Sequence, residues 1–103
     1  MRLWRGQLPI SQRAMDLSKK IIFVKKIGDA ELYGKTGTGC LNGHDGMEHA
    51  GKMLGWFVGA LKKNTKTYII VANASDLKNQ ARPGGPRMRD TTLEILKDLG
   101  LLQ

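Results

Sequence analysis

A glycine-rich run over residues 34–39 brings together the side chains best suited to bind an anion. It reads Gly-Lys-Thr-Gly-Thr-Gly and follows the apolar pair Leu32 and Tyr33. Alternate glycines leave one face of an extended chain without Cβ atoms, so a ligand or another backbone can approach closely. Lys35 offers a positive charge, Thr36 and Thr38 offer hydroxyl groups, and the bare peptides offer N–H donors. These groups suit an anionic group or a carbonyl oxygen lying beside a strand edge.

Two known motifs contain these residues, and the spacing and type of the flanking residues distinguish between the two motifs. A phosphate-binding P-loop requires a glycine at the position of Asp29 and a helix that begins at the Gly-Lys-Thr segment. Thr36 is followed by Gly-Thr-Gly, which forms helices poorly, so the P-loop is excluded. Lys35-Thr36-Gly37 matches instead the third signature of the penicillin-recognising serine enzymes, although a tripeptide alone is weak evidence.

The elements that position this run are two helices and three strands. Ser11 is a good helix N-cap, and apolar residues recur at helical spacing from Ala14 to Val24. Short apolar runs separated by turn residues predict strands, and the last leucines before Gly100 predict a final helix. The sequence therefore predicts an α+β fold, in which a three-stranded antiparallel sheet is flanked by N- and C-terminal helices. The expected helices span 11–24 and 89–99, and the expected strands span 30–38, 53–61 and 66–74.

Composition narrows the classes of function. The chain has 103 residues and a formal net charge of +8, but its basic residues are spread along the whole sequence. No basic helix and no stripe of aromatic and basic residues is present, so nucleic-acid binding is not favoured. No apolar run approaches the roughly 18 residues of a membrane span, and the basic N-terminus lacks the apolar core of a signal peptide. A chain made as given is expected in the cytoplasm.

Potential metal ligands cluster in the loop predicted over residues 39–51. Their spacing matches no zinc pattern, and a structural zinc site needs a fixed tetrahedral set of ligands. A solvated loop is the better interpretation, and we expect neither a metal nor a cofactor. The side chains considered are Cys40, His44, Asp45, Glu48 and His49.

The order of four separated features identifies a family. Residues 8–11 (Leu-Pro-Ile-Ser) open a helix, Lys-Thr-Gly follows at 35–37, Gly-Trp-Phe-Val-Gly at 55–59 and Tyr-Ile-Ile-Val-Ala-Asn at 68–73. This order resembles the C-terminal part of the class D (oxacillinase-type) β-lactamases and the similar sensor domains of β-lactam receptors, within the penicillin-binding, transpeptidase-like proteins. The resemblance covers nearly all 103 residues. It implies a partial β-lactamase/transpeptidase-like fold.

The resemblance also implies roles for particular residues. Lys35 would orient the carboxylate of a β-lactam, Thr36 would hydrogen-bond it, and the N–H of Thr38, which follows Gly37, would donate to the oxyanion. An arginine before the last helix also grips the carboxylate in many class D enzymes, and both Arg87 and Arg89 lie there. A cation at a helix N-terminus is disfavoured by the helix dipole, which argues for a functional arginine, with Arg89 slightly preferred.

The nucleophile of the family is missing from its expected place. The one Ser-x-x-Lys match, Ser75 to Lys78, follows the Lys-Thr-Gly strand instead of preceding it, and no Ser-x-Val is present. Ser75 also lies in a predicted loop, whereas a nucleophile needs a rigid helix start. Whether the chain is an enzyme therefore stays open, and no catalytic residue is assigned. In the intact family, which is periplasmic, the complete domain binds penicillins and hydrolyses β-lactams.

The leading hypothesis is a truncated class D β-lactamase-like chain that carries the substrate-binding strand and is inactive alone. Its ligand would be a β-lactam or a similar carboxylate, and its partner a complementary N-terminal fragment or a second copy. The alternatives are a non-catalytic binding module for carboxylates or β-lactams, and a basic nucleic-acid-binding domain that contains Lys-Thr-Gly by chance.

Overall fold

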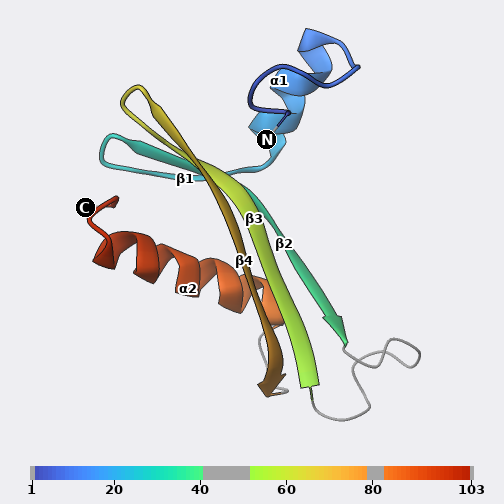
Figure 1. Ribbon diagram of the computed structural model, residues 1–103, viewed down its shortest axis with the longest axis vertical. Coiled ribbons are helices and arrows are strands. Elements are labelled where there is room, and N and C mark those ends of the chain that lie inside the picture. Colours follow the sequence, from blue (N-terminus) through green and yellow to red (C-terminus); the bar gives the residue numbers. More distant parts are fainter. Residues whose placement is uncertain (1, 41–51, 79–82, 103) are drawn as a thin grey trace.

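The chain forms two helices and one antiparallel sheet, as a computed structural model that describes residues 2–40, 52–78 and 83–102 shows (Figure 1). The strands lie in the sheet in the order β1-β2-β3-β4, so each one pairs with its neighbours in the sequence. The predicted α+β class is confirmed. The elements are α1 Gln12–Ile21, β1 Phe23–Ile27, β2 Ala30–Cys40, β3 Lys52–Lys63, β4 Lys66–Lys78 and α2 Gly84–Asp98.

The sheet has four strands, so the prediction of three was wrong. The additional strand, β1, begins at Phe23, where the first helix was expected to continue to Val24. Residues 21–24 read Ile-Ile-Phe-Val. β-branched and aromatic side chains lose freedom in a helix and fit a pleated strand, so α1 ends at Ile21. The start of α1 is as predicted, because the Ser11 side chain accepts a hydrogen bond from the Ala14 N–H, at 3.1 Å.

The other elements are longer than their predicted ranges. β2, β3 and β4 extend to Cys40, Lys63 and Lys78. Helix α2 begins at Gly84, five residues before the predicted start, directly after its N-cap Pro83. This start was not predicted because the first turn contains two glycines and a proline, which are typical of a loop. The sequence predicts a loop over residues 75–86, and this range was too wide at both ends: Ser75 lies within β4, and residues 84–86 lie within α2.

Two tight turns join the strands into hairpins. Gly28 has φ +60° between β1 and β2, and Asn64 has φ +57° between β3 and β4. Glycine and asparagine are the residues that adopt this left-handed conformation most readily. The sequence predicts a turn at Gly28 and Asp29, there between a helix and a strand, and a hairpin turn over residues 62–65. The structure has a hairpin at both places.

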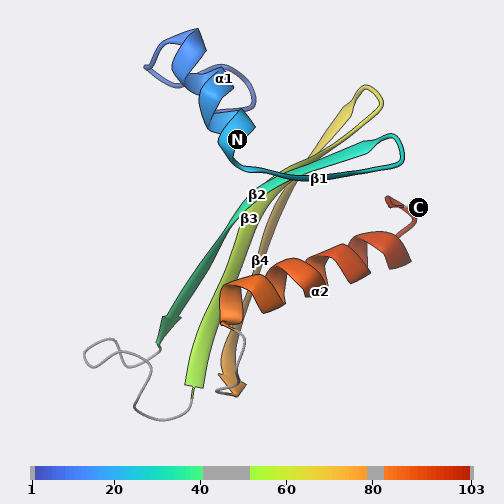
Figure 2. The ribbon, with the colours of Figure 1, turned by 180° about the vertical axis from the view of Figure 1, so that it is seen from behind.

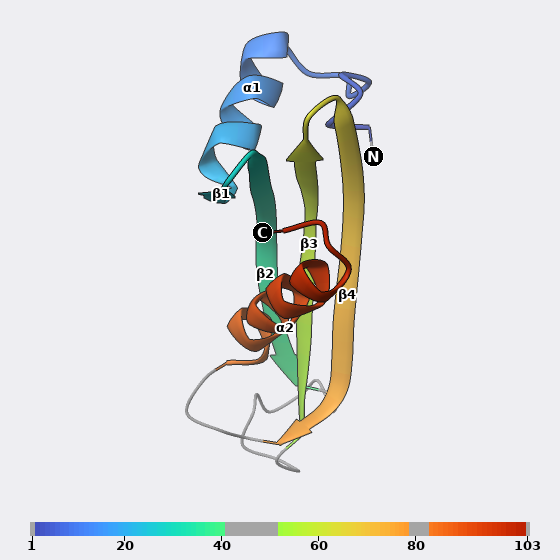
Figure 3. The same cartoon turned by 90° about the vertical axis from the view of Figure 1, so that its left-hand side faces the viewer.

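Helix α2 covers one face of the sheet and forms the core with it (Figures 2 and 3). Its Leu96 lies against Leu32 of β2 and against Phe57 and Leu61 of β3, and these three strand side chains are completely buried. Ala30 and Leu102 complete the buried cluster. Helix α1 lies at one end of the sheet, away from α2 (Figure 1). The core therefore fixes α2 against β2 and β3, the strands that carry the glycine-rich run and its partner.

The opposite face of the sheet is only partly covered. The Tyr33 ring meets Trp4 and Phe23 edge-on, each at 5.4 Å between centroids. Further along the sheet, Val71 of β4 is 61% exposed and Trp56 of β3 is 38% exposed. The alternation of side chains along a strand predicts that Trp56 and Phe57 point to opposite faces and that both pack in the core, but only Phe57 is buried.

Candidate functional site

The glycine-rich run lies along β2 at a point where one of its edges is open. β1 pairs with β2 only from Ala30 to Tyr33, and the last bond on this side joins the Gly34 N–H to the Ile22 carbonyl, at 2.8 Å. On its other side β2 pairs with β3 along its whole length. Within the described residues, the β2 edge from Lys35 onward therefore has no strand beside it. An open edge offers peptide groups to a ligand.

A pocket of about 280 Å³ opens at this edge. Its polar lining comes from Lys35 and Thr36 of β2 and from Arg89 of α2. The remaining walls are apolar or backbone. They come from the end of α1 and the start of β1, residues 21–24, and from Gly34 and Phe57. The fold thus brings together residues 35 and 89, which lie 54 positions apart in the sequence.

The two cations of the pocket are held loosely by the protein. The Lys35 ammonium donates a hydrogen bond to the Thr36 carbonyl, at 2.9 Å. The Arg89 guanidinium Nε donates to the Asp90 carboxylate, at 3.4 Å, and both of these side chains are more than a third exposed. Exposed ion pairs of this kind contribute little to stability. The Lys35 and Arg89 charges therefore stay available to an anion that enters the pocket.

Arg87 and Arg89 occupy different surroundings. Arg89 lies in the second turn of α2 and lines the pocket. Arg87 lies in the first turn, where its backbone N–H donates to the Pro83 carbonyl at 3.3 Å, and it is not among the residues that line this pocket. Because α2 begins at Gly84, the helix dipole argument made for a cation at residue 89 applies more weakly than expected.

Gly37 and Thr38 contact α2 instead of lining the pocket. The Thr38 hydroxyl accepts a hydrogen bond from the Gly85 N–H, at 2.8 Å. The backbone of Gly85 lies so close to β2 that a Cβ atom built on it would be 2.9 Å from the Gly37 carbonyl oxygen and from the Thr36 Cβ. This contact was not predicted from the sequence. The pair Gly84-Gly85 was its only signal, because adjacent glycines permit close backbone approach.

None of the serines lines this pocket. Ser11 caps α1, and the Ser18 hydroxyl donates to the Ala14 carbonyl at 2.8 Å. Ser75 lies in β4, which is separated from β2 by β3. The described residues contain no group of three or more possible metal ligands, and His44, Asp45, Glu48 and His49 lie outside them. No helix in the described part of the chain is long and apolar enough to cross a membrane.

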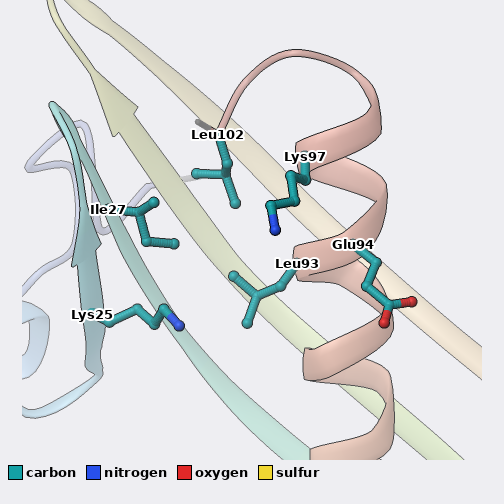
Figure 4. Close-up of a pocket in the computed structure, with 6 residues that line it drawn as sticks. All are labelled: Lys25, Ile27, Leu93, Glu94, Lys97 and Leu102. Carbon is teal, nitrogen blue, oxygen red and sulfur yellow. The ribbon is translucent and has the colours of Figure 1, made fainter.

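A second hollow of about 190 Å³ lies between β1 and α2 (Figure 4). Ile27, Leu93 and Leu102 give it an apolar lining, and the Lys25 and Lys97 side chains stand at its rim. None of the residues predicted for the site lines this hollow. Its ionisable side chains are Lys25, Glu94 and Lys97, whereas Lys35, Thr36 and Arg89 line the pocket at the β2 edge.

One titratable group beside the site is perturbed by its surroundings. Burial raises the pKa of the Tyr33 hydroxyl above 10.0, and the nearby Glu31 carboxylate raises this pKa further. The Tyr33 hydroxyl donates a hydrogen bond to that carboxylate, at 3.0 Å. Tyr33 therefore stays protonated at neutral pH and is the donor in its bond to Glu31, which lies two residues earlier on β2.

Comparisons with known proteins match nearly the whole chain. The penicillin-binding protein transpeptidase domain model matches residues 4–95. The probable β-lactamase YbxI of Bacillus subtilis is 30% identical over 101 residues, which are 98% of this chain and 32% of that protein. The solved class D β-lactamase YbXI from Nostoc is 34% identical with a TM-score of 0.75, over 98% of this chain and 38% of that one.

A third relative is similar in fold alone. The C-terminal domain of the Bacillus licheniformis BlaR penicillin receptor has a TM-score of 0.82 at 19% identity, over 99% of this chain and 37% of that domain. The chain thus spans about a third of the length of the relatives that it matches.

Proposed function

Because this chain belongs to the penicillin-binding protein transpeptidase domain family, we propose that it supplies the carboxylate-binding half of a β-lactam site. The ligand is a β-lactam or a similar small carboxylate, bound reversibly at the open edge of β2. The observation that carries the proposal is the pocket in which Lys35, Thr36 and Arg89 meet. Two cations and a hydroxyl beside an open strand edge match the charge and the hydrogen-bonding capacity of a carboxylate.

Each group has a distinct part in this proposal. The Arg89 guanidinium presents a planar fork of N–H donors that suits a carboxylate, whereas the Lys35 ammonium acts as a point charge. The Thr36 hydroxyl adds a neutral hydrogen bond, and the backbone N–H of Thr38 is the candidate donor to the β-lactam carbonyl oxygen. Gly37 keeps the strand free of side chains between these groups, so that the ligand can lie against the backbone.

We assign binding, and not hydrolysis, to the chain by itself. Acyl transfer needs a nucleophile next to a base and beside the donors that stabilise the oxyanion. Ser75, which starts the single Ser-x-x-Lys match, lies on β4, two strands away from the Lys-Thr-Gly segment. Hydrolysis or acylation would therefore require groups from outside these 103 residues.

We further propose that the isolated chain associates with a partner, either a complementary N-terminal fragment or a second copy of itself. β4 forms an edge of the sheet, and residues 67–75 of this strand carry no charge. Natural edge strands are usually protected by charges, prolines or bulges, which prevent pairing with other chains. Ile69 and Val71 are 44% and 61% exposed beside this edge, as is Leu99 of α2 at 67%. Pairing of another strand with β4 would cover these side chains.

Calorimetry with benzylpenicillin tests the binding proposal. Hydrogen bonds to charged groups contribute about 1.5–3 kcal/mol when formed and somewhat less at exposed sites. We expect Lys35→Ala and Arg89→Ala each to weaken binding about tenfold, which corresponds to about 1.4 kcal/mol. Lys20→Ala and Arg13→Ala remove the same charges from exposed positions of α1 and serve as matched controls. Equal affinity in all four variants, or no binding by the parent chain, would contradict the proposal.

A further inference from the structure

The N-terminus of α2 lacks a cap of its own. Its N-cap residue is Pro83, which forms no side-chain cap hydrogen bond. A helix N-cap normally supplies an oxygen that accepts the N–H of the second or third helical residue. Here the second helical residue is Gly85, and the third, Pro86, has no N–H to donate. Of these two residues, only Gly85 therefore has an N–H that a cap can accept.

That amide is satisfied from another element. The Thr38 hydroxyl of β2 accepts the Gly85 N–H at 2.8 Å, across 47 positions of sequence. This is the bond that a serine or threonine at the N-cap would make, supplied by a strand instead of by the preceding residue. We propose that Thr38 is the N-terminal cap of α2 and that this cap sets the position of Arg89 relative to Lys35 and Thr36.

The packing around the cap makes the position of α2 unusually sensitive to it. Gly84 lies against the backbone of Gly55 in β3, and a Cβ atom on Gly84 would be 3.1 Å from the Gly55 Cα. Gly85 lies equally close to Gly37 and Thr36. Neither glycine has a side chain that could fix the helix by interdigitation. Close backbone contact and the directional bond from Gly85 to Thr38 therefore both help to hold the first turn against the sheet.

The cap and the pocket are coupled through the geometry of the helix. Arg89 follows Gly85 by four residues, so the two positions lie on the same side of α2, one turn apart. A shift or rotation of the first turn therefore moves the Arg89 side chain with respect to the strand that carries Lys35 and Thr36. Thr38 thus acts on the pocket through Arg89, as a positioning residue. Only the effect on ligand affinity depends on the function proposed above.

The test begins without a ligand. Thr38→Val removes the hydroxyl and keeps the shape, whereas Thr38→Ser keeps the hydroxyl. By NMR we expect amide exchange at Gly85 to be about tenfold faster in Thr38→Val, and the Arg89 Nε–H signal to shift. Thr38→Ser and Thr67→Val, which removes a hydroxyl from an exposed position of β4, should match the parent chain in both readouts. Unchanged Gly85 exchange, or an unchanged Arg89 signal in Thr38→Val, would overturn the inference.

A double-mutant cycle then tests the coupling to the ligand. Thr38→Val should weaken benzylpenicillin binding about threefold to tenfold in the parent chain and have no further effect in the Arg89→Ala background. Equal effects in both backgrounds would overturn the positioning role, because Thr38 would then act independently of Arg89. Absence of binding in the parent chain would count against the proposed function alone, since Gly85 exchange and the Arg89 signal decide the inference without a ligand.

Discussion

The close contact between α2 and the site strand predicts that Gly85→Ala destabilises the protein. A Cβ atom at this position would lie 2.9 Å from three atoms: the Gly37 carbonyl oxygen, the Thr36 Cβ and the Thr38 Oγ1. These atoms belong to a strand that is paired with β3 along its length, so they cannot easily move away. The first turn of α2 must therefore shift outward by several tenths of an ångström, and its bond to Thr38 lengthens.

The magnitude of the stability change follows from two destabilising contributions and one stabilising contribution. Overpacking at a closely packed contact costs about 1–3 kcal/mol, and loss of the hydrogen bond to Thr38 costs about 1 kcal/mol. Alanine favours a helix over glycine by up to about 1 kcal/mol, which offsets part of this cost. We expect a net loss of about 2 kcal/mol in the free energy of unfolding, and a melting temperature lower by roughly 10 °C for a domain of this size.

Urea denaturation followed by circular dichroism measures this loss. Gly39→Ala is the matched control, because it places the same methyl group on β2 where no other atom lies within 4 Å. We expect its denaturation midpoint to equal or exceed that of the parent chain. A Gly85→Ala variant that is as stable as Gly39→Ala would refute the argument that close backbone contact holds α2 against the sheet.

Three further predictions concern ionisation, association and acylation. The pKa of Tyr33 is raised in the folded chain, so its contribution to stability is fully present below pH 10 and is lost as the pH rises further. Tyr33→Phe should therefore flatten this part of the pH–stability curve. An unchanged curve would count against the bond to Glu31. Val71→Lys should reduce self-association, measured by sedimentation, about tenfold, whereas Gln12→Lys on α1 should leave it unchanged. Equal effects of the two variants would exclude the β4 edge as the contact between copies of the chain. Fluorescent penicillin should not label the isolated chain on a denaturing gel; a labelled band would contradict this, and Ser75→Ala would show whether that serine is the nucleophile.

Much of the fold could be predicted because its patterns are local. The N-cap Ser11, the turn at Gly28 and the alternation around Leu32 each determine their own surroundings through capping, backbone conformation or burial. β1 was missed because its apolar residues continue the helical spacing of α1, and only the β-branched and aromatic side chains of residues 22–24 indicate a strand. Its pairing with β2 across the tight turn at Gly28 decided between the two.

For the candidate site, the sequence indicates the residue types but not how the fold brings them together. The residue types in the glycine-rich run indicated Lys35 and Thr36 as candidates, and the order of the motifs indicated the family. The choice between Arg87 and Arg89 depended on where α2 begins. That start is difficult to predict because the first three helical residues are two glycines and a proline, which are typical of loops. The contact between Gly85 and Thr38 joins two segments that no local pattern connects, so only the packed structure brings it into view.

The central claim is that the chain binds the carboxylate of a β-lactam reversibly, in the pocket between β2 and α2. The most direct test is an NMR titration of the isotope-labelled chain with benzylpenicillin and, in parallel, with its methyl ester, which lacks the negative charge. Intact-protein mass should be recorded after each titration. We predict saturable shifts centred on residues 34–38 and on Arg89 with the free acid, much weaker shifts with the ester, and no increase in mass. Equal responses to acid and ester, shifts centred elsewhere, or a covalent adduct would contradict the claim.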